Sequence, residues 1–340
     1  MFEHEEVRMV RGSRSGLPVI VAVHSTALGQ AVGGLRMWHY SDWRDGLADA
    51  LRLARGMTYK AAAAGATKGG GKTVVALPAV TSEALRRDAL LDAGDVIESF
   101  GGRYATAPDV GTSEADMDVI ATRTPHVFCR PLASGGSGDS SPATAAGVVA
   151  ALRALGPLAG RRFAVVGLGR VGGAVASTLA AAGAALVVTD VDPSRRALAD
   201  SLGATWVTPA EALTADVDVV VPAALGGLLT AEVVPALRCT AIAGPANNQL
   251  ADDAVADLLH ARGIVWAPDY VVSMGGVINA IAVEIDGASA AEAAARVDGI
   301  GDTVRDLLDI AGRDGVTPAR AAMDRARSRL AAGLVHSGRD

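Results

Sequence analysis

Two apolar patterns alternate along this chain. Short continuous runs of branched residues, at residues 17–23 (LPVIVAV) and 73–77 (TVVAL), predict buried strands. Residues 43–55 and 82–100 instead carry apolar side chains three and four positions apart, which predicts helices with one buried face. The first third of the chain is therefore expected to be an α/β domain.

A Gly/Ser-rich segment, residues 134–142 (SGGSGDSSP), has the composition of a hinge or interdomain loop. Beyond it the alternation resumes, and strands and helices are expected in turn along residues 144–154, 163–167, 173–182, 185–189, 218–222, 241–243 and 264–266. Alternation at this spacing predicts a parallel, doubly wound sheet of the Rossmann type. The tail beyond Ala291 is predicted to be helical and to pack in part on the first domain.

Composition narrows the class of protein. A chain of 340 residues, 50% of them hydrophobic and 20% charged, can bury the cores of two domains. The net charge of -6 disfavours a nucleic acid partner, and no apolar run reaches the roughly 20 residues of a membrane span. The acidic start does not resemble a secretory signal, and two cysteines cannot form a disulfide framework. We therefore expect a soluble, cytoplasmic protein without a membrane partner.

A glycine-rich turn follows the strand that ends at Val166. It reads Gly167-Leu-Gly169-Arg170-Val171-Gly172, and a helix is predicted after it. In this context the first glycine permits a tight turn, the second lets a pyrophosphate approach the backbone, and the third lets the helix pack close to the strand. The helix N-terminus would face the anion. The turn therefore predicts a dinucleotide site.

Asp190 ends the next predicted strand, about 20 residues after the turn. A carboxylate there accepts a hydrogen bond from the ribose 2′-hydroxyl and repels a 2′-phosphate. NAD is therefore favoured over NADP, although Arg195 and Arg196 stand nearby.

A second cluster of chemistry-bearing residues lies in the first domain. Met57-Thr-Tyr-Lys60 precedes a triple glycine and Lys72, and Asp109 follows at residues 107–112 (APDVGT). A desolvated lysine beside another cation loses its proton more easily, which suits a general base. Two lysines and a carboxylate can divide the work of amino acid oxidation, since one cation binds the substrate carboxylate, one amine activates water and the carboxylate relays protons.

The same cluster admits other interpretations. Any one of the three residues alone could be a solvated surface charge. A phosphate loop is rejected because its pattern needs a glycine where Ala66 stands. Lys68, next to the triple glycine, could influence Lys72 but is expected to be solvated. The six histidines are scattered without ligand spacing, so no metal site is predicted.

These segments together resemble the leucine/valine/phenylalanine dehydrogenases, the branch of the glutamate dehydrogenase superfamily that acts on apolar amino acids. The likeness runs from about Leu17 to the helical tail. It is carried by residues 29–37 (GQAVGGLRM), 55–60 (RGMTYK), 69–72 (GGGK), 102–112 (GRYATAPDVGT), 246–250 (ANNQL) and 268–276 (PDYVVSMGG).

The resemblance implies a domain plan and a reaction. Residues 1–135, with the helical segment at about 300–340, would form a substrate-binding and oligomerisation domain, and residues 142–295 the NAD-binding domain. The protein would be a homo-oligomer that converts an apolar L-amino acid and NAD to the 2-oxo acid, ammonia and NADH. The family binds substrate between its domains, and closure excludes water.

The resemblance also implies roles for individual residues. Lys60, with Met57 and the backbone of Gly33 and Gly34, would hold the substrate; Lys72 would activate water; Asp109 would exchange protons with the amino group. The remaining contacts implied by the family are Asn247 to substrate and nicotinamide, Thr144 and Ala223 to the cofactor, and Val277 and Ala280 at the floor of the side-chain pocket.

Some positions depart from the family pattern. Ser273-Met274 stands where Asn-Ala is usual, and Ala223 where cysteine is common. Pro108 resembles the phenylalanine-specific members and Val277 the aliphatic ones, while the small Ala280 leaves room for a large side chain. Valine, leucine and phenylalanine therefore all remain possible substrates.

Two alternatives remain open at this point. One is an NAD-linked oxidoreductase acting on a different small acid, although such enzymes pair a histidine with a carboxylate and no histidine here lies in such a motif. The other is a non-enzymatic, NAD-binding regulatory protein on the same fold, to which the change at Ser273 gives some support.

Overall fold

A computed structural model describes the backbone of residues 3–337 and the side chains through Leu334. The chain divides into two compact units. The first comprises the chain up to Asp139, the short segment Val283–Gly287 and the end from Arg325 onward. The second comprises Ser140–Ala282 and Ala288–Asp324.

The first unit is built on a five-stranded mixed sheet in the order β1-β2-β4-β3-β5. The strands β1 and β4 both run antiparallel to β2, whereas β3 runs parallel to β4 and to β5. Their bounds are β1 (Glu6–Arg11), β2 (Pro18–Ser25), β3 (Ala31–His39), β4 (Gly69–Leu77) and β5 (Tyr104–Pro108). The predicted strands β2 and β4 are present, and β4 begins earlier than expected, at the triple glycine.

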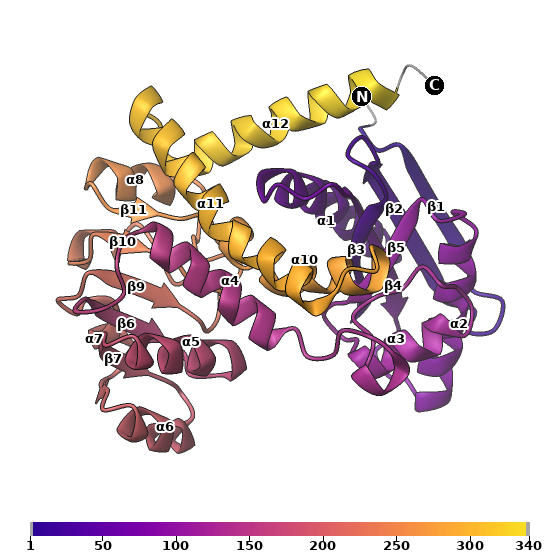
Figure 1. Ribbon diagram of the computed structural model, residues 1–340. Helices are drawn as coiled ribbons and strands as arrows, with labels where there is room; N and C mark the ends of the chain where they lie inside the picture. The colour runs from indigo at the N-terminus through magenta and orange to yellow at the C-terminus, as the bar shows by residue number, and fades with distance from the viewer. Residues whose placement is uncertain (1–2, 338–340) are drawn as a thin grey trace. The chain divides into compact units, whose positions relative to one another are not determined.

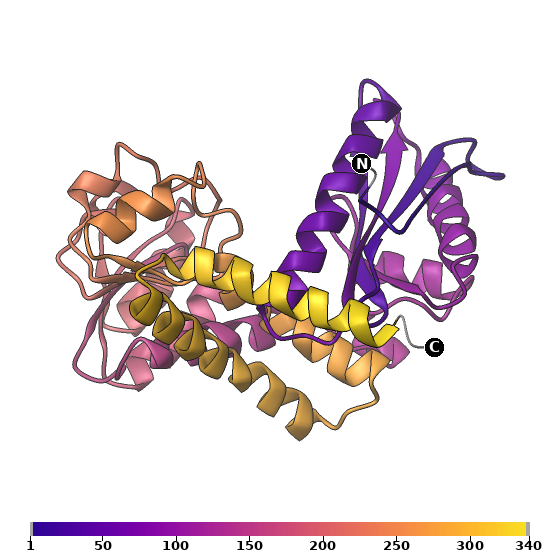
Figure 2. The same ribbon diagram turned by 90° about the horizontal axis from the view of Figure 1, so that it is seen from above.

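Helices cover both faces of this sheet, which makes three layers (Figure 2). Alternate residues of β2 divide between the faces: Ile20 and Ala22 pack on α1, and Val19, Val21 and Val23 pack on α2 and α3. The bounds are α1 (Trp43–Ala63), α2 (Glu83–Glu98) and α3 (Glu114–Ala121). Side chains fix where the helices begin, since Asp42 accepts a hydrogen bond from the Arg44 N–H and Ser82 from the Leu85 N–H.

The second unit contains a six-stranded parallel sheet in the order β11-β10-β9-β6-β7-β8 (Figure 1). The bounds are β6 (Arg162–Val166), β7 (Ala185–Thr189), β8 (Thr205–Trp206), β9 (Val219–Pro222), β10 (Ala241–Ile242) and β11 (Val265–Trp266). This is the doubly wound order of dinucleotide-binding sheets. Strands β7 and β8 lie on one side of β6, and the chain then crosses over to add β9, β10 and β11 on the other side. The predicted Rossmann-type fold is confirmed.

Helices accompany these strands, since β6 and β9 are buried on both faces. Between strands lie α5 (Arg170–Ala181), α6 (Arg196–Ser201), α7 (Pro209–Leu213) and α8 (Val255–Ala261). Helix α4 (Ser141–Ala154) precedes β6, and α9 (Asp269–Val272) and α10 (Gly275–Ala280) follow β11.

The C-terminal helices divide between the units. Helix α11 (Ala290–Asp314) belongs to the second unit, although residues 300–340 were expected with the first. The reason is close packing on α4, because a Cβ at Gly301 would lie only 2.8 Å from the Ala150 carbonyl oxygen. Helix α12 (Pro318–Ser337) meets the expectation in its second half, where Arg329 donates to the carbonyls of Ala62 and Ala66 at the end of α1, at 2.8 and 3.0 Å.

The loop between β1 and β2 is tied to α2 by one buried carboxylate. Asp92, 2% exposed, accepts hydrogen bonds from the Ser15 N–H at 2.8 Å, the Ser15 hydroxyl at 2.7 Å and the Arg14 guanidinium at 2.9 Å. Replacing Asp92 by asparagine is expected to destabilise the first unit by about 2–4 kcal/mol at pH 7, because these charge-assisted bonds are lost in a buried site. Urea unfolding followed by circular dichroism measures the effect.

The half-buried Asp88 on the same helix supplies the control, since Asp88→Asn should leave the midpoint nearly unchanged. Burial raises the pKa of Asp92, but the bonds from Ser15 and Arg14 outweigh it and hold the pKa below its ordinary value. Stability from a lowered pKa is present above the unfolded pKa and lost as pH falls through the folded one. Wild type and Asp92→Asn should therefore converge in acid, and equal midpoints at pH 7 would contradict this role.

Candidate active site

A buried lysine and a carboxylate from two strands meet in the first unit. Lys72 lies on β4 and is 7% exposed, and Asp109 directly follows β5. The Lys72 Nζ lies 2.8 Å from the Asp109 Oδ2. The structure thus brings together two of the predicted catalytic residues.

Strand β3 separates β4 from β5, and Gly34 on β3 makes the contact between them possible. A Cβ at Gly34 would lie 2.7 Å from the Asp109 Cβ and 3.3 Å from the Lys72 Nζ. Only a residue without a side chain lets Lys72 reach across β3 to Asp109. Its neighbour Gly33 allows β3 to approach β4, since a Cβ there would lie 1.8 Å from the Gly71 carbonyl oxygen.

The pair is charged in a way that suits proton transfer. Burial lowers the pKa of Lys72; Asp109 opposes this, and the positive charge of Arg36 adds to it. Burial alone would raise the pKa of Asp109, but Lys72 and Arg36 outweigh it and hold that pKa below its ordinary value. Asp109 is therefore a carboxylate, and Lys72 loses its proton more readily than an exposed lysine.

The turn after β5 holds Asp109 in place. The Asp109 N–H donates to the Thr112 hydroxyl oxygen at 2.9 Å, and that hydroxyl donates to the Leu35 carbonyl at 2.8 Å. Gly111 has φ +80°, and a Cβ there would lie 1.9 Å from the Met37 carbonyl oxygen. The segment 109–112 is thus fixed to β3 by bonds that leave the Asp109 side chain projecting beside Lys72.

Arg36 is a site residue that the sequence analysis missed. Its Nε donates to the Asp109 Oδ2 at 2.9 Å, and its Nη1 donates to the Asp49 Oδ2 at 2.7 Å. Arg36 lies two positions after Gly34 on β3, so both face the same side of the sheet. That spacing is the signal that could have identified it.

The last turns of α1 lie against the same end of β4. A Cβ at Gly70 would lie 2.1 Å from the Thr58 backbone nitrogen, so helix and strand are in direct contact. Met57 and Lys60, both half-buried, flank this contact along α1. The predicted carboxylate-binding lysine therefore belongs to an element that packs on the strand carrying Lys72.

The second unit holds the glycine turn in the predicted strand–turn–helix setting. Gly167 has φ +108°, the left-handed region that favours glycine. A Cβ at Gly172 would lie 2.0 Å from the Gly167 carbonyl oxygen, whereas a Cβ at Gly169 would meet nothing within 4 Å. Gly169 and Arg170 are exposed at the start of α5, and Val171 is half-buried. The open face at Gly169 fits the approach of a pyrophosphate to the helix N-terminus.

Asp190 is held by the same turn. It accepts hydrogen bonds from the Leu168 N–H at 2.6 Å and from the Asp192 N–H at 2.8 Å. Ala223, at the end of β9, donates its N–H to the Val166 carbonyl at 2.8 Å and lies against Gly167. Three predicted cofactor contacts thus gather where β6, β7 and β9 end, which is where ligands bind to such sheets.

Thr144 and the predicted pocket residues lie on two helices that pack together. The Thr144 hydroxyl donates to the Ser140 carbonyl at 2.9 Å, and its oxygen would lie 2.7 Å from a Cβ at Gly276. Val277 and Ala280 both lie on α10, where Val277 is half-buried and Ala280 is only 1% exposed.

A buried glutamine, also missed from the sequence, shapes the loop that carries Asn247. The Gln249 amide donates to the carbonyls of Gly244 and Ala246 and accepts from the Trp266 indole N–H, at 2.8, 3.0 and 3.0 Å. Asn247 is exposed at the surface of this loop, and the Ser273 hydroxyl lies 3.4 Å from its Oδ1. The serine that departs from the family pattern therefore still contacts Asn247.

The expectation that Lys68 is solvated is wrong. Its Nζ pairs with Asp286 at 2.9 Å, and its side chain is 12% exposed. Asp286 belongs to Val283–Gly287, the segment of the chain that returns to the first unit. A contact between residues so far apart in sequence has no local signal.

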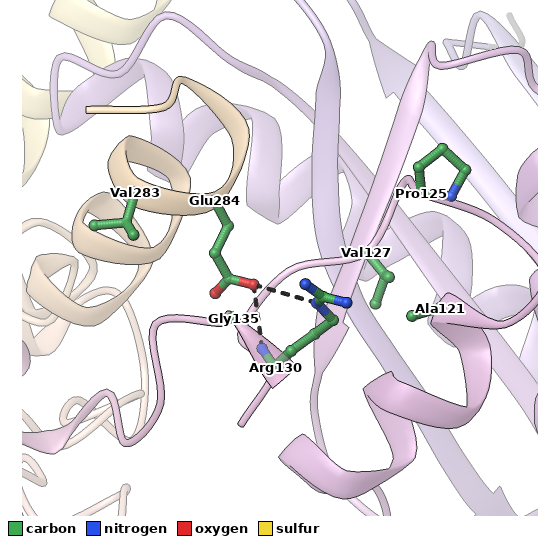
Figure 3. Close-up of a pocket in the computed structure, with 7 residues that line it drawn as sticks. All are labelled: Ala121, Pro125, Val127, Arg130, Gly135, Val283 and Glu284. Carbon is green, nitrogen blue, oxygen red and sulfur yellow. Dashed lines mark hydrogen bonds and ion pairs between the residues drawn. The ribbon is translucent and has the colours of Figure 1, made fainter. Parts of the chain in front are cut away.

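The same returning segment lines an open pocket of about 360 Å³ in the first unit (Figure 3). Its wall includes Glu284, whose carboxylate accepts hydrogen bonds from the N–H groups of Cys129, Ser137 and Arg130 at 2.8, 2.8 and 3.3 Å. None of the predicted site residues lines it. Glu284 thus fixes the loop at 129–137, and its acceptor oxygens are occupied by backbone.

The described part of the chain offers neither a metal cluster nor a membrane span. No group of three or more histidine, cysteine, aspartate or glutamate side chains in it could hold a metal ion. Among the helices that the structure describes, none is both long and apolar enough to cross a membrane.

The two units define a class of protein. A Rossmann-type sheet with an open glycine turn is typical of dinucleotide-binding proteins, and a buried lysine–carboxylate pair on a separate α/β unit suits proton transfer. This combination is that of a pyridine nucleotide dehydrogenase.

Comparison with known proteins gives the family. The Glu/Leu/Phe/Val dehydrogenase dimerisation domain matches residues 1–126, and the Glutamate/Leucine/Phenylalanine/Valine dehydrogenase model matches residues 188–293. The chain is 43% identical to a leucine dehydrogenase from Bacillus cereus (97% of this chain, 92% of that one) and 41% identical to a valine dehydrogenase from Streptomyces virginiae (96% and 94%). The structure resembles L-tryptophan dehydrogenase from Nostoc punctiforme, with a TM-score of 0.88 and 35% identity over 98% of this chain and 97% of that one. The chain belongs to the Glu/Leu/Phe/Val dehydrogenase family and is an amino acid dehydrogenase acting on CH–NH2 donors.

Two glycines of the turn should respond differently to the same substitution. Gly169→Ala places a methyl group in open space, so the melting temperature should stay within about 2 °C while affinity for the reduced dinucleotide falls roughly tenfold or more. Gly172→Ala forces a clash with the Gly167 carbonyl and should lower the melting temperature by several degrees, about 4 °C or more. Thermal unfolding and titration of dinucleotide fluorescence measure the two effects. Unchanged dinucleotide affinity in Gly169→Ala would contradict the site.

Proposed function

We propose that this protein catalyses the reversible, NAD-dependent oxidative deamination of an apolar L-amino acid. The amino acid zwitterion, NAD and water would give the 2-oxo acid anion, an ammonium ion, NADH and a proton. The observation that carries the proposal is the buried contact between Lys72 and Asp109, 2.8 Å apart, in a family whose named relatives include leucine, valine and tryptophan dehydrogenases.

NAD, when bound, would supply the hydride acceptor for the substrate Cα, and the proton transfers would fall to protein side chains. Lys60, with the backbone at Gly33 and Gly34, would bind the substrate carboxylate. Asp109, held as a carboxylate, would take a proton from the substrate ammonium group. Lys72, whose pKa is lowered by burial, would in its neutral form take a proton from the water that attacks the imino carbon. Met57 and Asn247 would complete the substrate contacts.

The use of lysine elsewhere in the chain supports these roles. Of 31 lysine and arginine residues only three are lysine, and they are Lys60, Lys68 and Lys72. Arginine supplies cations everywhere else, but it cannot be deprotonated in a protein and so cannot act as a base. Lysine thus appears only around the segment for which a lysine base is proposed.

NAD is proposed over NADP because of Asp190. Two backbone N–H groups fix its carboxylate at the end of β7. A fixed negative charge there accepts a hydrogen bond from a ribose 2′-hydroxyl and repels a 2′-phosphate. Thr144, Ala223 and the turn from Gly167 to Gly172 would supply the other cofactor contacts.

The substrate side chain is proposed to be apolar because Val277 and Ala280 are both apolar. Leucine, valine and phenylalanine are the candidates. A homo-oligomer formed through the first unit is also proposed, since the family model matched there is a dimerisation domain.

A screen of L-amino acids with NAD and with NADP, followed as absorbance of the reduced nucleotide, tests the whole proposal. The expected result is turnover with leucine, valine or phenylalanine and at least a tenfold preference for NAD in kcat/KM. The reverse reaction should require both ammonia and a 2-oxo acid. Higher kcat/KM with glutamate would refute the apolar pocket, and no turnover in either direction would refute the enzymatic function.

Lys72→Ala is expected to lower kcat by about 10²–10⁴-fold, because proton transfer by a positioned base contributes that much. Since Lys72 must be neutral to act, kcat/KM for deamination should rise with pH and level off below the ordinary lysine pKa of 10.5. Initial rates between pH 7 and 11 measure this. Lys68→Ala, which removes a neighbouring lysine outside the proposed machinery, is the control and should keep the wild-type pH profile. A Lys72→Ala enzyme with wild-type kcat would contradict the mechanism.

A further inference from the structure

Two cations share one oxygen of Asp109. The Lys72 Nζ lies 2.8 Å and the Arg36 Nε 2.9 Å from the same atom, Oδ2. Among the residues that the structure describes, no hydrogen bond reaches the other oxygen, Oδ1. The Asp109 carboxylate is therefore held through Oδ2, and Oδ1 is left to accept a hydrogen bond from a ligand.

Arg36 is itself braced from α1. Its Nη1 donates to the Asp49 Oδ2 at 2.7 Å, and the same oxygen accepts the Tyr40 hydroxyl at 2.7 Å. The Arg52 guanidinium binds the Asp49 Oδ1 at 2.5 Å. The guanidinium plane thus bridges two carboxylates, a geometry that a rigid fork of donors provides and a single ammonium group does not.

Charged groups approach Lys72 from several packed elements. Those that act on Lys72 are Asp109 after β5, Arg36 on β3 and Asp49 on α1. Other titratable side chains on the elements around β4 include Arg52 and Lys60 on α1, His24 on β2 and Tyr40 after β3. Burial and the neighbouring His4 lower the pKa of His24 to about 4, and burial with the Asp49 bond raises that of Tyr40 to about 12, so both are neutral at physiological pH. Arg36 is the cation that directly contacts the partner of Lys72.

Removing this cation would change both members of the pair in the same direction. The charge of Arg36 lowers the pKa of Lys72 by repulsion and lowers the pKa of Asp109 by attraction. Without Arg36, Lys72 would be the one remaining cation bonded to the Oδ2 of Asp109, and this stronger bond would stabilise the charged form of Lys72. Both groups would then need a higher pH to reach the proposed active state, in which Asp109 is ionised and Lys72 is neutral.

We propose that Arg36 is a positioning residue, braced by Asp49, that fixes Asp109 with Oδ1 free for the substrate amino group and keeps Lys72 able to release its proton. This inference rests on the proposed function, because it assigns Arg36 a role in that reaction. It acts through Asp109 and Lys72 and needs no contact of its own with the substrate.

Three variants test the proposal. Arg36→Met removes the charge and the bridge, and Arg36→Lys keeps the charge but cannot bridge both carboxylates. Arg44→Met removes an arginine that is 68% exposed near the start of α1 and pairs with Asp42, so it is the matched control. Circular dichroism establishes that each variant keeps its secondary structure, including that of the first unit. Dinucleotide binding establishes that the second unit is intact.

The first measurement is the pH dependence of kcat/KM for deamination. Arg36→Met should lose about 10–100-fold in kcat/KM near pH 8 and shift the acid limb up by about 0.5–1 pH unit. Arg36→Lys should recover most of the pH shift while kcat stays low, since the carboxylate is no longer held in one orientation. Arg44→Met should match wild type. A merely structural Arg36 would lower activity equally at every pH.

The second measurement does not depend on turnover. Trace acetylation with acetic anhydride between pH 7 and 11, read by mass spectrometry, reports how the reactivity of Lys72 rises as it loses its proton. With only three lysines, Lys60 and Lys68 serve as internal references. The midpoint for Lys72 should move to higher pH in Arg36→Met and stay unchanged in Arg44→Met.

The two measurements separate the possible failures. A wild-type enzyme that deaminates no apolar amino acid refutes the proposed function, while the acetylation midpoint still tests the effect of Arg36 on Lys72. An active wild type, with the acid limb and the acetylation midpoint both unmoved in Arg36→Met, overturns the role of Arg36.

Discussion

The contact between Lys72 and Asp109 sets the constraints on the rest of the first unit. A charged pair that is largely withdrawn from water is stable only when its geometry is good and its other bonds are satisfied. Gly34 meets the first requirement, because a side chain on β3 would stand between the partners. Arg36 and the turn at Thr112 meet the second, since one binds the carboxylate and the other its backbone. In the sheet order β4-β3-β5, the central strand β3 thus allows residues from its two neighbours to form one ion pair.

The second unit uses glycine in three different ways within six residues. Gly167 adopts a backbone angle that other residues avoid, Gly172 lets α5 approach β6, and Gly169 leaves surface free. Two of these uses concern folding, and the third is the open surface at which we propose that the dinucleotide binds. Because the turn is local, its glycine spacing together with the apolar run before it and the helical pattern after it predicted the strand, the turn and the helix in the right order.

Local patterns predicted β2, β4, the helices α1 and α2, the lysine–carboxylate cluster and every Rossmann strand except the two-residue β8. Those predictions depended on neighbours in sequence: apolar runs, helical periodicity and residues at fixed spacing. Arg36 and Glu284 escaped because Asp109 and Cys129, which they contact, lie 73 and 155 positions away in the chain. Lys68 was misjudged for the same reason, since its partner Asp286 is more than 200 residues away. Gln249 escaped although its partners Gly244 and Ala246 are near in sequence, because no apolar or charge pattern marks a buried amide. Residues 300–314 of helix α11 lie in the second unit and not in the first, with which residues 300–340 are expected, because a helical pattern shows which face is buried and not what covers it.

The scarcity of lysine has a practical side. Aldehydes and active esters, which attach enzymes to supports, react with primary amines. In this chain such groups are confined to the N-terminus and to three lysines within thirteen consecutive residues, from Lys60 to Lys72. Lys72 is 7% exposed and the Lys68 side chain only 12%, so Lys60 at the end of α1 is the most accessible of the three lysines for amine coupling. The 37 acidic side chains are spread along the chain, so carboxyl-directed coupling is the chemistry by which this protein could be immobilised elsewhere on its surface.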